Sequence, residues 1–219
     1  MNARARRLLI IFALLVAPYL VNGVVNTWLA RQAWMYWSFE FLCWAVVPGA
    51  LLLLAHRVAG IDAAALGCRR RVAGRDSWPL VVVASLLLAA TWPPCYEALH
   101  ALAARSFPPT PLFAYEDMTP RNPPWRLLAV LWYALSAGLV EELIYRGYGW
   151  QVCRALPWPR ACYLGPVPLI FAAVHWEAGI AAVLVAWVFG VLAALIYLAL
   201  GNLWPLVVGH AVTDFTVFA

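Results

Sequence analysis

Three short stretches of this chain place ionisable side chains in otherwise apolar surroundings. The first begins with adjacent carboxylates, Glu141 and Glu142, and continues to Arg146. Glu142 and Arg146 are four residues apart with the acid first, which favours an ion pair on one face of a helix. Glu141 lies about 100° around an α-helix from Glu142, so its carboxylate is free to point elsewhere.

Histidines mark the other two stretches. Phe171 and His175 are one helical turn apart, and Pro166 precedes them at a point suited to the first turn of a helix. His210 and Asp214 have the same spacing, which lets the carboxylate approach and orient the imidazole. The structural alternatives are a buried hydrogen bond or a charge cluster at a helix end. An ionisable residue inside a membrane span costs roughly a few kcal/mol, so each is a candidate functional residue.

One carboxylate and two imidazoles suit the activation of water for hydrolysis of an acyl group. Glu141 would act as general base, while His175 and His210 would position water and stabilise the anion that forms on a carbonyl. The same three side chains could instead hold a divalent metal such as Zn²⁺, with water in a fourth position. The sequence does not separate these mechanisms. It contains neither an HExxH nor a GxSxG motif.

Distances along the expected helices place these side chains in one layer. If a helix begins near Val167, His175 lies about 12 Å from the cytoplasmic face, at 1.5 Å per residue. His210 then lies about 10 Å and Glu141 about 8 Å from that face of an apolar core about 30 Å thick. This agreement depends on a helix break at Pro166.

The composition indicates which elements must hold these residues. Of the 219 residues, 65% are hydrophobic and only 11% are charged, and the mean hydropathy is +0.80. Soluble domains carry about 25% charged residues, so the sequence predicts a polytopic membrane protein and excludes a soluble globular protein. We expect an all-α transmembrane helix bundle of about seven helices, within a range of about six to eight. The expected helices are Leu8–Val25, Trp34–Ala55, Trp78–Trp92, Trp125–Val152, Val167–Trp176, Ile180–Leu200 and Leu203–Phe218, with a further short or interfacial helix at Tyr96–Ala104.

The arginines predict the orientation in the membrane. Eleven of the 15 are expected on one side: Arg4, Arg6, Arg7, Arg57, Arg69, Arg70, Arg71, Arg75, Arg146, Arg154 and Arg160. The positive-inside rule therefore puts the N-terminus in the cytoplasm. The connection from Phe107 to Pro124 is rich in proline, so we expect a non-helical external loop, either a lid or a rigid link. Glu40, within the second expected span, has no partner that spacing identifies.

The ordered motifs EExxxR (Glu141, Glu142, Arg146), FxxxH (Phe171, His175) and HxxxD (His210, Asp214) resemble the CAAX-processing and bacteriocin-processing family of intramembrane peptidases. This family is also called Abi or type II CAAX proteases, and the resemblance covers about Trp125 to Asp214. It implies a helix bundle with a polar cavity open to membrane and cytoplasm. The resemblance does not reach the first 124 residues. We expect a single integral membrane domain over 1–219, with N-terminal helices and the Pro-rich loop in 1–124 and the peptidase core in 125–219.

The resemblance also implies roles for individual residues. The residue matching Glu141 activates water with help from the one matching His175, and those matching His210 and Asp214 are assigned to the oxyanion. An ionised Asp cannot donate a hydrogen bond, so we expect Asp214 to orient His210. The supporting residues are Glu142, Arg146 and Phe171. A glutamate mechanism without cofactor is implied, with a metal at Glu141, His175 and His210 as the alternative.

The expected function is therefore an intramembrane endopeptidase that cleaves a membrane-associated protein or peptide. Abundant Arg without Lys suggests a bacterial chain in the inner (cytoplasmic) membrane, where a prenylated substrate is not expected. The candidate substrates are a bacteriocin precursor, an anti-sigma factor and a C-terminal sorting helix. The lipid bilayer is the other partner, and no nucleic-acid partner is expected. The alternatives are a non-catalytic membrane immunity or scaffold protein and a transporter.

Overall fold

The helices of the chain follow its apolar segments. The computed structural model describes residues 1–29, 32–108 and 110–219, and within these residues the chain forms seven helices and one small hairpin. π-Helical turns continue or interrupt three of the helices. In chain order the elements are α1 (Ala3–Val24) with η1 (Val25–Leu29), α2 (Ala33–Phe41) with η2 (Leu42–Val46) and α3 (Val47–Ala59), the strands β1 (Arg71–Val72) and β2 (Arg75–Asp76), α4 (Trp78–Ser106), η3 (Tyr115–Asp117), α5 (Pro123–Glu141) with η4 (Glu142–Tyr148) and α6 (Gly149–Arg154), α7 (Pro159–Leu164) with α8 (Pro166–Ala173), η5 (Trp176–Ala178), α9 (Ile180–Leu200) and α10 (Trp204–Phe218).

Among the described residues, five helices are long and apolar enough to cross a membrane. They are Ala3–Trp28, Ala33–Ala59, Trp78–Ser106, Pro123–Arg154 and Ile180–Leu200. The chain is thus an all-α, multi-pass membrane protein, as the composition predicts.

Prolines mark where several helices begin. Pro79, Pro123, Pro166 and Pro205 each lie in the first turn of a helix, where the missing N–H has no intrahelical partner to lose. Ser77 caps α4 by accepting a hydrogen bond from the backbone N–H of Leu80 at 3.4 Å. The break expected at Pro166 is present, because α7 ends at Leu164 and α8 starts two residues later.

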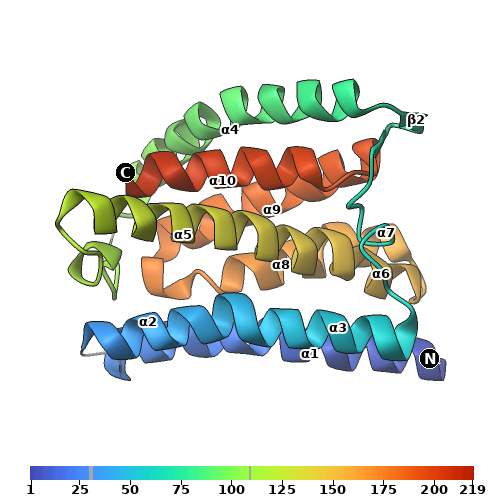
Figure 1. Ribbon diagram of the computed structural model, residues 1–219, viewed down its shortest axis with the longest axis horizontal. Helices are drawn as coiled ribbons and strands as arrows, with labels where there is room; N and C mark the ends of the chain where they lie inside the picture. Colours follow the sequence, from blue (N-terminus) through green and yellow to red (C-terminus); the bar gives the residue numbers. More distant parts are fainter. Residues whose placement is uncertain (30–31, 109) are drawn as a thin grey trace.

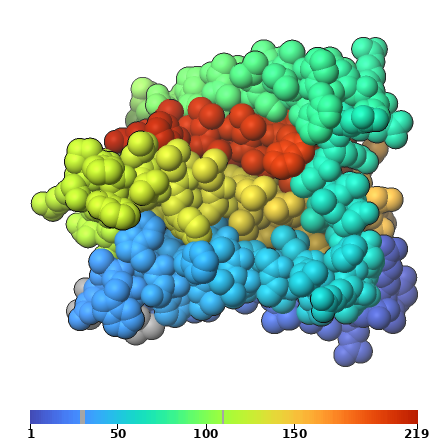
Figure 2. All heavy atoms as spheres, in the orientation of Figure 1, coloured from blue at the N-terminus to red at the C-terminus, as the bar shows by residue number. Residues whose placement is uncertain are grey.

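The helices pack in layers, with α10 between α4 and α5 (Figure 1). α1 and α3 lie side by side at one face, and α4 covers the opposite face. α10 packs between α4 and α5, and α8 packs against α9. Figure 2 shows α10 between α4 and α5 on the visible face. This arrangement brings the C-terminal helix directly against the helix that carries Glu141.

The two ends of the bundle separate the connections as the arginine count predicts. The N-terminus, β2, α6 and α7 lie at one end, and the C-terminus lies at the other with the start of α5 (Figure 1). Arg146 is the exception. It is not in a connection at all but is buried in η4, with only 3% of its surface exposed.

Two helix boundaries and one loop differ from expectation. Tyr96–Ala104 is not a separate helix, because α4 runs from Trp78 to Ser106 through Pro93 and Pro94. Prolines inside membrane helices are tolerated where neighbouring helices support them, and here α10 packs along α4. The helix expected at Val167–Trp176 ends at Ala173. The connection after α4 contains the 3₁₀ turn η3, and α5 already begins at Pro123.

A short hairpin holds the connection between α9 and α10 in place. β1 and β2 pair antiparallel, and Arg70 Nε lies 2.7 Å from Asp76 Oδ1. The Asn202 side-chain amide donates hydrogen bonds to the carbonyls of Arg69 and Arg71, the latter at 2.9 Å. These contacts fix the start of α10, which carries His210.

Candidate active site

The segment that carries the adjacent carboxylates changes its helical form between them. α5 ends at Glu141, and the seven residues of η4 that follow form a π-helix. π-Helical turns are rare and occur frequently at functional sites. The rotation about the helix axis from one residue to the next is smaller in a π-helix than in an α-helix. The carboxylates of Glu141 and Glu142 both lie close to the imidazole of His210 on α10.

Glu142 forms the centre of a buried charge cluster. Its Oε1 accepts a hydrogen bond from His210 Nδ1 at 2.8 Å and lies 3.2 Å from Arg146 Nη1. The i,i+4 pair expected from spacing is present, and a residue 68 positions away joins it. The Arg146 guanidinium also lies over the Phe171 ring, 4.3 Å from its centroid. The three predicted supporting residues therefore form one cluster, and Glu142 connects this cluster to His210.

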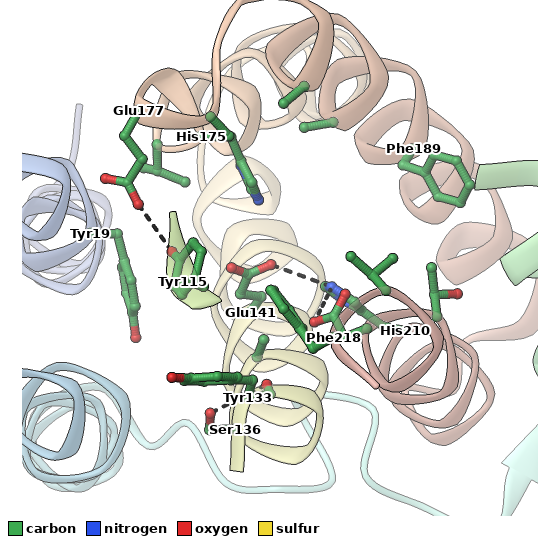
Figure 3. Close-up of a pocket in the computed structure, with 18 of the residues that line it drawn as sticks. Tyr19, Tyr115, Tyr133, Ser136, Glu141, His175, Glu177, Phe189, His210 and Phe218 are labelled. Atoms are coloured by element: carbon green, nitrogen blue, oxygen red, sulfur yellow. Dashed lines mark hydrogen bonds and ion pairs between the residues drawn. The ribbon is translucent and has the colours of Figure 1, made fainter. Parts of the chain in front are cut away.

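Glu141 faces the other side of the same imidazole. Its Oε2 is 3.7 Å from His210 Nε2 (Figure 3). Asp214 Oδ2 is 3.6 Å from the same nitrogen, so two carboxylates lie near His210 Nε2. Both distances exceed that of a hydrogen bond. Glu141 is 5% exposed, and its Oε2 has no hydrogen-bond partner among the described residues. His210 donates its hydrogen bond to Glu142, while Asp214, the residue expected to orient the imidazole, lies 3.6 Å from Nε2.

His175 lies in the turn that follows α8. Its Nδ1 is 2.8 Å from the carbonyl oxygen of Phe171, one turn earlier. A carbonyl only accepts hydrogen bonds, so Nδ1 carries the hydrogen, and in the neutral ring Nε2 is left as an acceptor. Figure 3 shows the ring of His175 pointing toward Glu141.

Glycines allow α10 to approach α5 on one side and α4 on the other. A Cβ at Gly138 on α5 would lie 2.9 Å from the backbone nitrogen and the Cβ of Ala211 on α10. Ala211 follows His210 directly, and Gly138 precedes Glu141 by three residues. On the other side of α10, a Cβ at Gly209 would overlap the indole ring of Trp92 on α4. Close backbone packing at these points sets the distance between Glu141 and His210.

All four predicted catalytic residues line one cavity of about 450 Å³. Glu141, His175, His210 and Asp214 come from three separate segments of the chain. The predicted supporting residues Glu142, Arg146 and Phe171 line it as well. The cavity wall also includes Phe113, Ala114 and Tyr115 of the Pro-rich connection, which is tied to η5 by a hydrogen bond from Leu112 N to Glu177 O at 2.7 Å.

The cavity contains polar residues that the spacing of motifs does not reveal. Glu40, whose partner the sequence does not identify, lines the cavity together with Tyr19, Tyr115 and Glu177. A signal for Glu177 exists in the sequence, because it is one of only two acidic residues after Glu142 and lies two positions from His175. Nothing in the sequence relates it to Tyr115, which is 62 residues away.

Among the residues that the structure describes, no group of three or more His, Cys, Asp and Glu side chains has an arrangement that could hold a metal ion. The set proposed from sequence, Glu141, His175 and His210, is brought to one cavity without forming such a group.

Comparison with known proteins identifies one matching family. The sequence model of the family described as "Type II CAAX prenyl endopeptidase Rce1-like" matches residues 123–216. That segment runs from the start of α5 into α10 and includes all three motifs. Comparison with curated proteins and with solved structures gave no match.

Proposed function

Residues 123–216 form a domain of the Rce1-like type II CAAX prenyl endopeptidase family, and from this premise we propose that the chain is an intramembrane endopeptidase with Glu141 as its general base. The observation that carries the proposal is the carboxylate of Glu141. It is buried, lines the cavity and has an oxygen for which the described residues provide no hydrogen-bond partner, while two imidazoles share the same cavity. A buried carboxylate of this kind is suited to accept a proton from water.

The proposed reaction is hydrolysis of a peptide bond. Glu141 takes a proton from a water molecule, and the oxygen of that water attacks the carbonyl carbon. His175 Nε2 accepts a hydrogen bond from the same water and so holds it in place. The tetrahedral intermediate then breaks its C–N bond, and the proton held by Glu141 passes to the departing amine.

His210 is proposed to stabilise the oxyanion that forms on the carbonyl oxygen. Its Nδ1–H is held by Glu142, so only the imidazolium form has a hydrogen on Nε2 to donate. Glu141, Glu142 and Asp214 all lie within 3.7 Å of the ring nitrogens and compensate its positive charge. Asp214 then acts through His210, because its own ionised carboxylate has no hydrogen to donate.

The substrate in this proposal is a membrane-anchored protein or peptide, with a C-terminal sorting helix as one candidate. The proposed location is the bacterial inner membrane with a cytoplasmic N-terminus. We further propose that 1–219 form one integral membrane domain, with 125–219 as the peptidase core.

The experiment uses purified protein in proteoliposomes and a library of internally quenched transmembrane peptides. Wild-type protein should cleave a subset of peptides, and Glu141→Gln should lower the rate about 10²- to 10⁴-fold because the general base is lost. Glu97→Gln is the matched control, since Glu97 is exposed on α4 and should retain full activity. Equal cleavage by wild type and Glu141→Gln would refute the proposed base.

The two rival functions give different results in the same assay. A non-catalytic immunity or scaffold protein would release no product, and Glu141→Gln would change only its stability. A metal-dependent version of the peptidase would lose activity with 1,10-phenanthroline and recover it with Zn²⁺. The proposed mechanism predicts that the chelator leaves the rate unchanged.

A further inference from the structure

The cavity extends from Glu141 to a second pair of buried carboxylates that the proposed reaction does not use. Glu40 comes from α2 and Glu177 from η5, and both line the cavity. Glu40 is 2% exposed and Glu177 is 6% exposed. Burying two carboxylates is costly unless each is paired, so their presence in one cavity requires a reason.

The carboxylate of Glu177 is only half satisfied. Its Oε1 accepts a hydrogen bond from the Tyr115 hydroxyl at 3.0 Å, and its Oε2 has no partner among the described residues. The backbone makes room for this group, because a Cβ at Gly23 on α1 would overlap Oε2. Oε2 therefore lies against the backbone of α1, while Oε1 is the oxygen beside Tyr115, which lines the cavity.

Among the described residues that line the cavity, acidic side chains outnumber arginines. Six acidic residues line the cavity: Glu40, Glu116, Glu141, Glu142, Glu177 and Asp214. Arg146 is the one arginine among the lining residues, and it is paired with Glu142. The sequence contains no lysine. Carboxylates gathered in a cavity with apolar walls attract positive charge.

Aromatic rings surround the same carboxylates. The ring of Tyr115 lies 5.1 Å from that of Phe113, 5.8 Å from that of Tyr133 and 5.5 Å from that of Phe218, between centroids. All four line the cavity. Carboxylates together with aromatic faces suit a guanidinium or ammonium group, which binds both by charge and by cation–π contact. In Figure 3 Tyr115 lies between Glu177 and Glu141.

We propose that Glu40, Tyr115 and Glu177 form an acidic subsite that binds a basic side chain of the substrate close to the bond cleaved at Glu141. This inference rests on the proposed function and names its substrate class: a membrane-associated peptide with Arg or Lys near the scissile bond. The basic side chain of the substrate supplies a positive charge to Glu40 and Glu177, and this fixes the register of the peptide in the cavity.

The test uses matched transmembrane peptides that carry Arg or Gln at each position near the cleaved bond. Wild type should cleave the best Arg peptide with a kcat/KM at least about 30-fold above that of its Gln counterpart. Glu177→Gln and Glu40→Gln should lower the ratio of kcat/KM between the Arg and Gln peptides to about 1–3, whereas Glu97→Gln should keep the wild-type ratio. Gly23→Ala should weaken the preference as well, because it displaces the Glu177 carboxylate without removing it.

A binding measurement separates failure of this inference from failure of the proposed function. Arginine amide should raise the Tm of wild-type protein and of Glu141→Gln in detergent, but not that of Glu177→Gln, and glutamine amide should have no effect. If Glu141→Gln loses all cleavage and wild-type protein cleaves the Arg and Gln peptides at equal rates, the subsite alone is overturned. Cleavage by Glu141→Gln at the wild-type rate would overturn the proposed function, while the arginine amide shift would still report on the subsite. No shift with wild type would overturn the subsite.

Discussion

At the scale of single residues, the site is organised around one imidazole and the carboxylates that contact it. Glu142 accepts the hydrogen bond from His210 Nδ1 and pairs with Arg146 through the same oxygen. Glu142 is fully buried and Arg146 is 3% exposed. Because neither charge reaches solvent, each depends on the other for compensation.

Removing one member of this buried pair should be strongly destabilising. Glu142→Ala leaves the Arg146 guanidinium buried without its partner, which costs about 3–5 kcal/mol. Arg146→Met should also destabilise, and the double variant should lose less than the sum of the two. Reversible unfolding in mixed micelles measures the three free energies. Strictly additive losses would show that Glu142 and Arg146 are not coupled in the folded protein.

Glu177 should make stability depend on pH. Burial raises the pKa of Glu177 above its ordinary value, and the hydrogen bond from Tyr115 partly opposes this. The folded state therefore binds its proton more tightly than the unfolded state. The stability this contributes is complete below the unfolded pKa of about 4.3 and is lost as pH rises through the folded value. As pH rises through the folded pKa, the Tm of Glu177→Gln, measured in detergent, should exceed that of wild type by an increasing amount. A difference in Tm between Glu177→Gln and wild type that is the same at all pH values would contradict this prediction.

At the scale of elements, the site depends on the close approach of α5 and α10. A Cβ at Gly138 would lie within 3.0 Å of the backbone nitrogen of Ala211 and of the carbonyl oxygen of Val207. α10 is also packed against α4 on its other side, so it cannot move away freely. The distance from Glu141 to His210 therefore depends on the packing of Gly138 against α10 as well as on the contact between the two side chains.

Gly138→Ala should separate the two helices and reduce activity. The added methyl meets backbone atoms, and overpacking of this kind costs about 1–3 kcal/mol. We expect cleavage to fall about tenfold or more, because misplacement of catalytic groups by 1 Å can cost about 10²-fold. Gly49→Ala on α3 is the control, since a Cβ there has no neighbour within 4 Å among the described residues. Equal activities of the two variants would show that this contact does not position the site.

At the scale of the whole molecule, the charged connections gather at opposite ends of the bundle. The N-terminal arginines and the hairpin with Arg70 share one end, and the connection with Arg121 precedes α5 at the other (Figure 1). From the positive-inside rule we propose that the first end faces the cytoplasm.

Cysteine labelling tests this orientation. In a variant without the five native cysteines, Arg4→Cys, Arg70→Cys or Arg121→Cys places one thiol at an exposed position. A membrane-impermeant maleimide should label Arg121→Cys in intact spheroplasts, and should label the other two only after permeabilisation. The reverse pattern would invert the assigned topology and place the hairpin outside.

The sequence alone determined the membrane class, most helix positions, the helix break at Pro166 and the Glu142–Arg146 pair. These follow from hydropathy and from spacing within one helix, which are local properties of the chain. Only the tertiary structure decided that Glu142 rather than Asp214 holds His210, that a π-helical turn directs both carboxylates to one imidazole, and that Glu40 and Glu177 share the cavity. Those contacts join segments far apart in the chain. In a bundle whose surfaces are uniformly apolar, the rotation and depth of each helix are set by glycine contacts and packing, which hydropathy does not record.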